Sequence, residues 1–185
     1  MKVNELYNLI TTRHSCRKFS GKEISAEDLR KIVECGLCAP SAMNRQPWHF
    51  IVIQDKQMFK NLNKHAKESF AQFGETWQKD WAKRADFSVF YDPDAMIVVC
   101  SDDSVKFSKN DCCFAVMNMN LMAEALGIGS CIIQSIDWAI DDTNKEEFGI
   151  PEGYSPYLAL SLGYPAAENL AKKKFDNSKF KFLNE

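Results

Sequence analysis

The stretch APSAMNRQPWHFIVI, residues 39–53, connects the end of a predicted helix to the first predicted strand. Pro40 ends the helix, and the run HFIVIQ at 49–54 is typical of a strand. Small residues and a proline let a backbone come close to a flat ligand, and Asn44 and Gln46 supply amide donors and acceptors that suit the polar edge of a heterocycle. Taken alone, the stretch also fits an ordinary helix-to-strand turn.

Helical periodicity is found on both sides of this connection. Ser25 and Asp28 predict a capping box that opens the helix ending near Pro40. Apolar residues at spacings of three and four predict further helices over 3–12, 56–73 and 110–126, with a short one near 142–148. The stretch 74–93 is rich in aromatic residues among charges and is predicted to be helix and loop standing off the main core.

Short apolar runs predict the remaining strands at 95–100, 130–136 and 156–162, and the alternating tail SKFKFLNE is typical of a final edge strand. Helices and strands are interspersed without strict alternation. An α+β fold with a mixed central β-sheet flanked by helices is therefore expected, rather than a doubly wound parallel one. No linker or repeat interrupts the 185 residues, so a single domain spanning 1–185 is expected.

Composition excludes several classes of protein. The formal net charge is -2 and the pI is about 6.0, so nucleic acid is not expected as a partner. No run approaches the ~18 apolar residues of a membrane helix, and the N-terminus lacks the apolar region of a signal peptide. We therefore expect no membrane association and a cytoplasmic location.

The seven cysteines are an odd number without a repeated spacing, which favours free thiols in a reducing compartment. Cys35 and Cys38 form a CxxC pair, which could be a thiol redox centre or half a zinc site. However, the pair lies at the end of a predicted helix, and no second pair with suitable spacing follows. No metal site is expected.

Three further segments carry candidate binding residues. Arg13-His14-Ser15-Cys16-Arg17 brings two guanidiniums and a hydroxyl within five residues, which suits a phosphate, although it also fits a solvated helix end. The glycines at 127 and 129 precede Ile132, Ile133, Gln134 and Ser135, but an isolated GxG is weak evidence. The lysine triplet 172–174 is either a solvated surface or a source of cations for a phosphate.

Together these segments resemble the nitroreductase family of flavoproteins. The matching segments follow the family order along nearly the whole chain: RHSCRKF (13–19), APSAMNRQPWHFIVI (39–53), EALGIGSC (124–131), IPEGY (150–154) and LALSLGYP (158–165). The resemblance implies a homodimer with FMN at the subunit interface and a nitroreductase-like sandwich. It also implies exchange of C-terminal segments between subunits, in which 178–185 could be the exchanged strand.

The resemblance also implies a set of cofactor-binding residues. Arg13 and Ser15 match positions that hold the FMN phosphate and ribityl chain, and neighbouring His14 is included as a candidate. Arg17 matches a basic residue at the ribityl chain or pyrimidine end. A loop that the partner subunit lays against the flavin is matched by Pro40, Ser41, Ala42 and Asn44. The segment along the other side of the flavin ring, in which a backbone N–H points at flavin N5, is matched by Ile132, Ile133, Gln134 and Ser135. A basic pair late in the chain that binds the same phosphate is matched by Lys172 and Lys174.

The implied activity is ping-pong transfer of hydride from NADH or NADPH, through flavin N5, to a nitroaromatic, a quinone or a similar flat acceptor. The flavin carries this chemistry, so no catalytic side chain is assigned. Acceptor choice is expected to lie in the aromatic stretch 70–91, although most of these aromatics also fit core or dimer contacts. Reductive dehalogenation, flavin fragmentation and non-enzymatic flavin binding or sensing remain alternatives on the same scaffold.

Overall fold

The computed structural model describes residues 3–167 and 175–183 and confirms the α+β fold. Its strands are β1 (Trp48–Ile53), β2 (Ala95–Asp102), β3 (Gly129–Ile133) and β4 (Tyr154–Gly163), in the order β1-β2-β4-β3. All three strand pairings are antiparallel. The expected mixed character is thus limited, in the described residues, to one parallel bridge between Ser15 and Ser130.

The four longer predicted helices are confirmed, whereas the short one near 142–148 is a 3-10 helix over Lys145–Phe148 and the strand predicted at 130–136 already ends at Ile133. The four are α1 (Val3–Thr12), α2 (Ala26–Leu37), α3 (Lys56–Phe73) and α5 (Ser108–Ala125), and Ser25 caps α2 by accepting a hydrogen bond from the Asp28 N–H. The stretch 74–93 contains α4 (Thr76–Ala82) followed by turns. Short 3-10 helices complete the described chain: η1 (Ala42–Asn44), η2 (Ile136–Trp138), η3 (Lys145–Phe148) and η4 (Asn177–Lys179).

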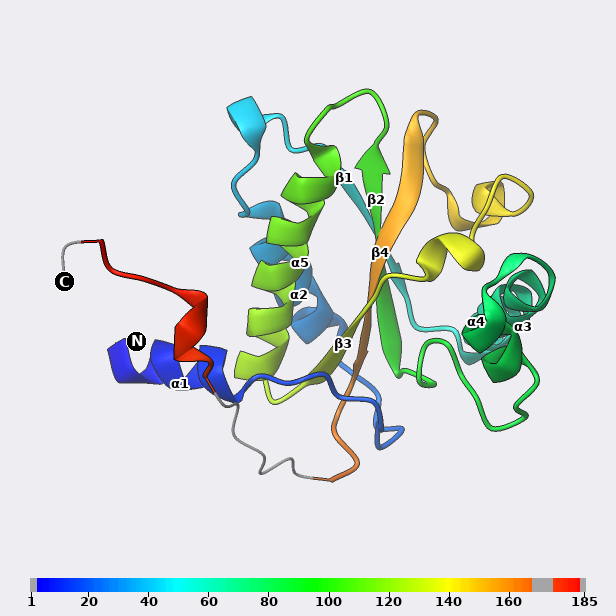
Figure 1. Cartoon of the computed structure of the whole chain (residues 1–185), viewed down its shortest axis with the longest axis horizontal. Coiled ribbons are helices and arrows are strands. Elements are labelled where there is room, and N and C mark those ends of the chain that lie inside the picture. The colour runs from blue at the N-terminus through cyan, green and yellow to red at the C-terminus, as the bar shows by residue number, and fades with distance from the viewer. Residues whose placement is uncertain (1–2, 168–174, 184–185) are drawn as a thin grey trace.

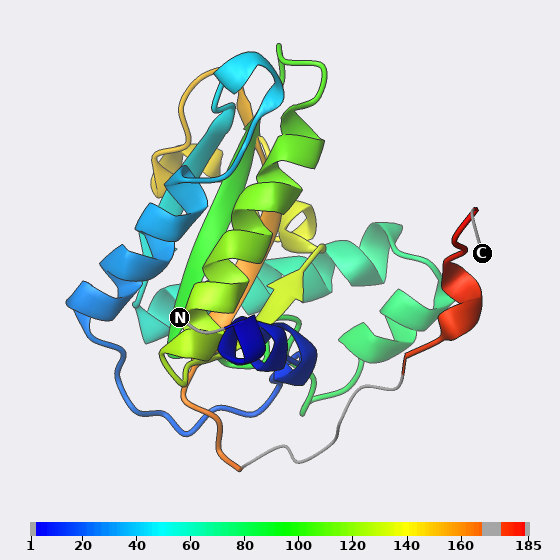
Figure 2. The same ribbon diagram turned by 90° about the vertical axis from the view of Figure 1, so that its left-hand side faces the viewer.

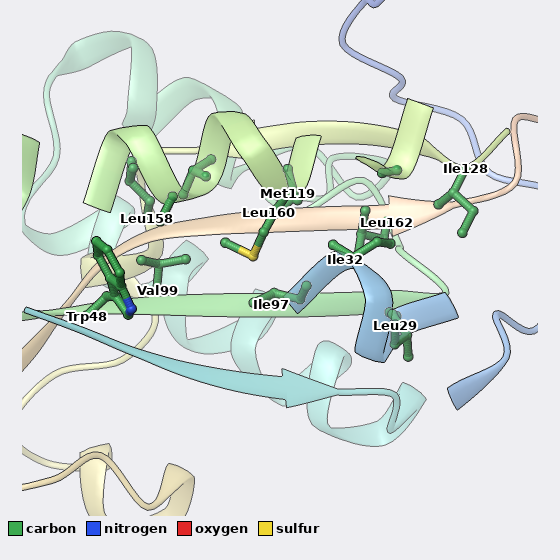
Figure 3. Close-up of a cluster of buried hydrophobic side chains, with 14 of the residues drawn as sticks. Leu29, Ile32, Trp48, Ile97, Val99, Met119, Ile128, Leu158, Leu160 and Leu162 are labelled. Atoms are coloured by element: carbon green, nitrogen blue, oxygen red, sulfur yellow. The ribbon is translucent and has the colours of Figure 1, made fainter. Parts of the chain in front are cut away.

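The sheet is covered on both faces (Figure 1). Helices α2 and α5 lie side by side on one face (Figure 2), where alternate residues such as Ile97 and Leu160 pack against Ile32 and Met119 (Figure 3). The intervening residues, such as Val98 and Ala159, point to the other face, where they join a second core with α3 and η2. The period-2 pattern of the strands therefore builds both cores at once.

The two ends of the chain leave apolar surface uncovered. Helix α1 buries none of its residues, and its predicted apolar face stays in solvent, with Val3 85% and Tyr7 58% exposed. The tail 175–183 lies on the α1 side of the molecule (Figure 1) and includes Phe182, which is 61% exposed. The prediction of a final edge strand is wrong for these described residues, which form η4 and no strand, because a strand requires a neighbour to hydrogen-bond.

The outer edge of β1 has no neighbouring strand among the described residues. At the opposite edge, the segment after α1 runs along the sheet. The Cys16 N–H donates to the Ser130 carbonyl (2.8 Å) and the Ser20 N–H donates to the Tyr164 carbonyl (2.8 Å). These bonds hold the basic segment 13–17 against the start of β3.

Candidate functional site

A pocket of about 370 Å³ lies where β3 ends and faces the region after α3. One wall is the continuous segment from Cys131 to Ser135, which leaves the sheet at Ile133 and enters η2. The opposite wall is aromatic, and Arg17 reaches the pocket from the N-terminal segment. The lining is completed by Phe70, Trp77, Trp81, Phe87, Val89 and Tyr91.

The predicted basic segment and the segment 132–135 meet at this pocket. Cys16 is 6% exposed, and its backbone bond to Ser130 fixes the residues on either side of it. Burial raises the pKa of the Cys131 thiol, whereas the Arg17 and Arg13 guanidiniums and the Ser15 hydroxyl act to lower it. Three of the predicted polar groups therefore lie close enough to influence one buried thiol at the pocket wall.

The aromatic wall is a connected set of rings. Trp77 and Trp81 pack edge to face with centroids 4.8 Å apart, and Trp81 packs on Phe87 at 5.1 Å. Trp77 and Trp81 remain 47% and 42% exposed, so both offer ring surface to a ligand. The expectation that the stretch 70–91 contains pocket residues matches this geometry, but the sequence did not assign individual members.

Arg17 is held over one of these rings. Its Cζ lies 5.6 Å from the ring centroid of Tyr91, which is within the range of a cation–π contact. Arg17 is also the one charged residue that lines the pocket as the described part of the chain forms it. The pocket is thus positively charged and flanked by aromatic faces.

The loop that carries Pro40, Ser41, Ala42 and Asn44 lies elsewhere. It packs at the other end of the sheet, where the Ala42 N–H donates to Oδ2 of Asp111 (3.2 Å), and Figure 2 shows η1 far from α1. Met43, Asn44 and Gln46 all have positive φ. A single chain does not bring this loop to the pocket, so its contact with a partner's flavin stays a prediction.

The remaining predicted residues are placed as follows. His14 is half-buried beside Arg13, but it does not line the pocket. Lys172 and Lys174 lie outside the described residues. Ile133 is buried, Ile132 and Ser135 are half-buried and Gln134 is exposed, and all four line the pocket.

The geometry gives no support to a thiol redox centre or a zinc site at Cys35 and Cys38. Cys35 lies in the last turn of α2 and Cys38 caps it, and burial, with smaller effects from Cys38 and Glu34, raises the pKa of the Cys35 thiol. A reactive thiolate requires the opposite shift. Across residues 3–167 and 175–183, no group of three or more His, Cys, Asp or Glu side chains could hold a metal ion.

No helix in the described ranges is long and apolar enough to cross a membrane.

Comparison with known proteins identifies the family. The family model for the nitroreductase family matches residues 10–164. A protein of Archaeoglobus fulgidus, provisionally named NADH dehydrogenase/NAD(P)H nitroreductase, is 36% identical over 176 residues, which cover 90% of this chain and 88% of the relative. An iodotyrosine deiodinase of Thermotoga neapolitana is 27% identical over 177 residues, which cover 86% of this chain and 88% of the relative.

Solved structures agree with the sequence relatives. A nitroreductase of Bacteroides fragilis with bound FMN superposes with a TM-score of 0.90 at 28% identity, covering 98% of this chain and 100% of the other. The family model, the relatives and the fold all lead to the same conclusion. The chain belongs to the nitroreductase family.

Proposed function

We propose that this chain binds FMN in the pocket beside β3 and reduces a flat organic acceptor at the expense of NADH or NADPH. The observation that carries the proposal is one pocket lined by Arg17 and the segment 132–135, with Arg13 and Ser15 close enough to act on Cys131 in its wall. The FMN bound to the Bacteroides fragilis nitroreductase, and the names of the relatives, support the same cofactor and activity.

The residues at the pocket fit a flat group that carries a phosphate. Guanidiniums and a hydroxyl offer charge-assisted hydrogen bonds to phosphate oxygens, and Arg13 and Ser15 lie beside the pocket wall. The segment 132–135 leaves the strand and offers a long, continuous surface against which a ring can lie. A pocket of about 370 Å³ is within the ordinary size of cofactor sites.

FMN held in this pocket would supply hydride and electron transfer between the nicotinamide and the acceptor. The residues of the chain would position the cofactor and set the charge around it. Arg17 places a cation at the pocket, which would favour a negatively charged, reduced cofactor. Trp77, Trp81 and Phe87 offer faces on which a flat acceptor can stack. No side chain is needed as a catalytic acid.

The proposed working unit is a homodimer. The exposed apolar residues of α1 and of the tail, such as Leu6, Ile10, Phe180 and Leu183, form surface that a second copy can cover. The loop 40–44 lies away from the pocket of its own chain, which fits a role at the partner's pocket. In this dimer the tail 178–185 docks on the partner. The chain is further proposed to be a single domain in the cytoplasm, where its seven unpaired cysteines stay reduced.

An absorbance spectrum tests the cofactor and the donor together. The purified protein is reconstituted with FMN and desalted, and spectra are taken without oxygen before and after addition of NADH or NADPH. Flavin absorption that survives desalting and bleaches with one donor is expected. A protein that stays colourless would rule out FMN binding, and bound flavin that neither donor bleaches would rule out the reductase.

Reductive removal of iodine from an iodinated tyrosine is a second candidate. It is favoured by the iodotyrosine deiodinase of Thermotoga neapolitana among the relatives and by a pocket that combines the Arg17 cation with several aromatic rings. Release of iodide from diiodotyrosine with a chemical reductant measures this activity. Nitroaromatic or quinone turnover without iodide release supports the first candidate, whereas iodide release at a higher kcat/KM supports the second.

A further inference from the structure

Tyr91 is joined to Arg17 at the pocket wall. The guanidinium lies 5.6 Å from the centroid of the tyrosine ring, and both side chains line the same pocket. Arg17 is exposed and forms no ion pair with a carboxylate within the residues that the structure describes. A long, exposed side chain without such a partner samples many rotamers, so a ring beneath its head group restricts it.

The backbone at Tyr91 has an unfavourable conformation. Its φ is +64°, and the next residue, Asp92, has a φ of +48°. Tyrosine is not a residue that adopts the left-handed region readily, and two such residues in succession are uncommon. Strained positions of this kind persist where the surroundings fix them, and they cluster at functional sites.

The surroundings fix this turn from both sides. The Tyr91 N–H donates to the Ser88 carbonyl (3.4 Å), and the Asp92 N–H donates to the Ser88 hydroxyl (3.2 Å). Before the turn, Phe90 is 1% exposed, and after it the Asp94 N–H donates to the Leu162 carbonyl (2.9 Å). The turn is therefore anchored in the second core and in β4, and its geometry directs the Tyr91 ring to Arg17.

We infer that Tyr91 is a positioning residue that fixes the Arg17 guanidinium at the flavin site. This inference rests on the proposed function, because it assigns Arg17 to the cofactor. The ring contributes through its face and not through its hydroxyl. The positive φ angles of Tyr91 and Asp92 place the ring beside Arg17 at a position that lies in no helix or strand.

The test is a double-mutant cycle. FMN dissociation constants and flavin reduction potentials are measured for the wild type, Tyr91→Leu, Arg17→Gln and the double variant, with Tyr91→Phe as the conservative replacement. The matched control is Tyr164→Leu, which removes the other cation–π contact of the same N-terminal segment, that of Lys22 over Tyr164 at 4.3 Å. Tyr91→Asn also removes the ring, but asparagine tolerates positive φ, so this variant separates loss of the ring from loss of folding.

Loss of the ring is expected to weaken FMN binding roughly two- to fivefold, the effect of one exposed cation–π contact, and to make the potential more negative. Tyr91→Phe and Tyr164→Leu should match the wild type in both quantities. In the Arg17→Gln background, removal of the ring should have no further effect. The inference is overturned if Tyr91→Leu and Tyr91→Asn bind FMN like the wild type, or if they weaken binding equally without Arg17.

Failure of the proposed function gives a different result. If the wild type binds no FMN, both the proposed function and the role of Tyr91 fail. If the wild type binds FMN and the Tyr91 variants change nothing, only the positioning role fails.

Discussion

Cys16 occupies the space that a side chain at position 129 would need. A Cβ added to Gly129 would lie 2.8 Å from both Cβ and Sγ of Cys16 and 3.1 Å from Cγ of Pro165. The absence of a side chain at Gly129 thus allows the segment that carries Arg13, Ser15 and Arg17 to lie flat on β3.

We expect Gly129→Ala to lower the free energy of unfolding by ~1–3 kcal/mol, because the added methyl group overpacks a fixed contact. It should also weaken FMN binding, since the basic segment must move. Urea denaturation and flavin titration measure the two effects. Gly36→Ala is the matched overpacking control, because its Cβ would lie 2.8 Å from Cγ of the buried Met119, in the core between α2 and α5 and not at the basic segment. If Gly129→Ala bound FMN with the affinity of the wild type, the contact between Cys16 and Gly129 would not determine how the basic segment meets the cofactor.

Arg13→Ala should weaken FMN binding by ~1.5–3 kcal/mol, which is roughly a ten- to hundredfold rise in the dissociation constant, because the phosphate loses a charge-assisted partner. Fluorescence titration of FMN measures the change. Arg30→Ala removes the same charge from an exposed position on α2 and should leave the affinity unchanged. Unchanged affinity in Arg13→Ala would place Arg13 outside the site.

Asp141 links the turn after η2 to α3. Its carboxylate accepts hydrogen bonds from the Thr143 hydroxyl (2.6 Å) and the Thr143 N–H (2.8 Å), and it pairs with the His65 ring (3.0 Å). The Thr143 hydroxyl and His65 lower the pKa of Asp141 to about 2. A carboxylate whose pKa is lower in the folded than in the unfolded chain stabilises the fold above its ordinary pKa near ~4 and loses that effect as the pH falls toward about 2.

The free energy of unfolding of Asp141→Asn is therefore expected to be lower than that of the wild type by ~0.5 kcal/mol at pH 7, an estimate that allows for the exposure of the pair. The difference should shrink between pH 4 and pH 2. Urea denaturation across this range provides the check. Asp142→Asn is the control, because its carboxylate pairs instead with Lys145 on the surface. A difference that stays constant down to pH 2 would contradict the assignment.

Replacement of Phe180 and Phe182 by serine should convert the proposed dimer to a monomer, because these exposed rings, which pack on each other at 5.6 Å, are proposed to dock on a partner. Multi-angle light scattering measures the mass. Phe73→Ser is the control, since Phe73 is 71% exposed on α3, on the opposite side of the molecule (Figure 1). A double variant that remains dimeric would exclude the tail from the interface.

Local patterns predicted most of the fold. The helix at 56–73 has the predicted bounds, because Asp55 caps its start and the apolar spacing of three and four continues to Phe73. The prediction of an edge strand in the tail was wrong for residues 175–183 of the single chain. An alternating pattern forms a strand only when a neighbouring strand supplies hydrogen bonds, and no local pattern encodes that neighbour. The direction of strand pairing likewise depends on how distant segments meet.

The site was predictable only in part. The segments near Arg13 and near Ile132 each carry a recognisable pattern, and the structure brings them together. Tyr91 carried no such pattern, because its role depends on a positive φ that tyrosine rarely adopts.

The outer edge of β1, which has no neighbouring strand among the described residues, has a consequence for the unassembled chain. Its residues include no lysine or proline that would discourage foreign strands, and Val52 is 43% exposed there. Such an edge is a template for pairing with a strand of another chain. Val52→Lys, which places a charge on this edge, should therefore raise the fraction of the protein that stays in solution during refolding.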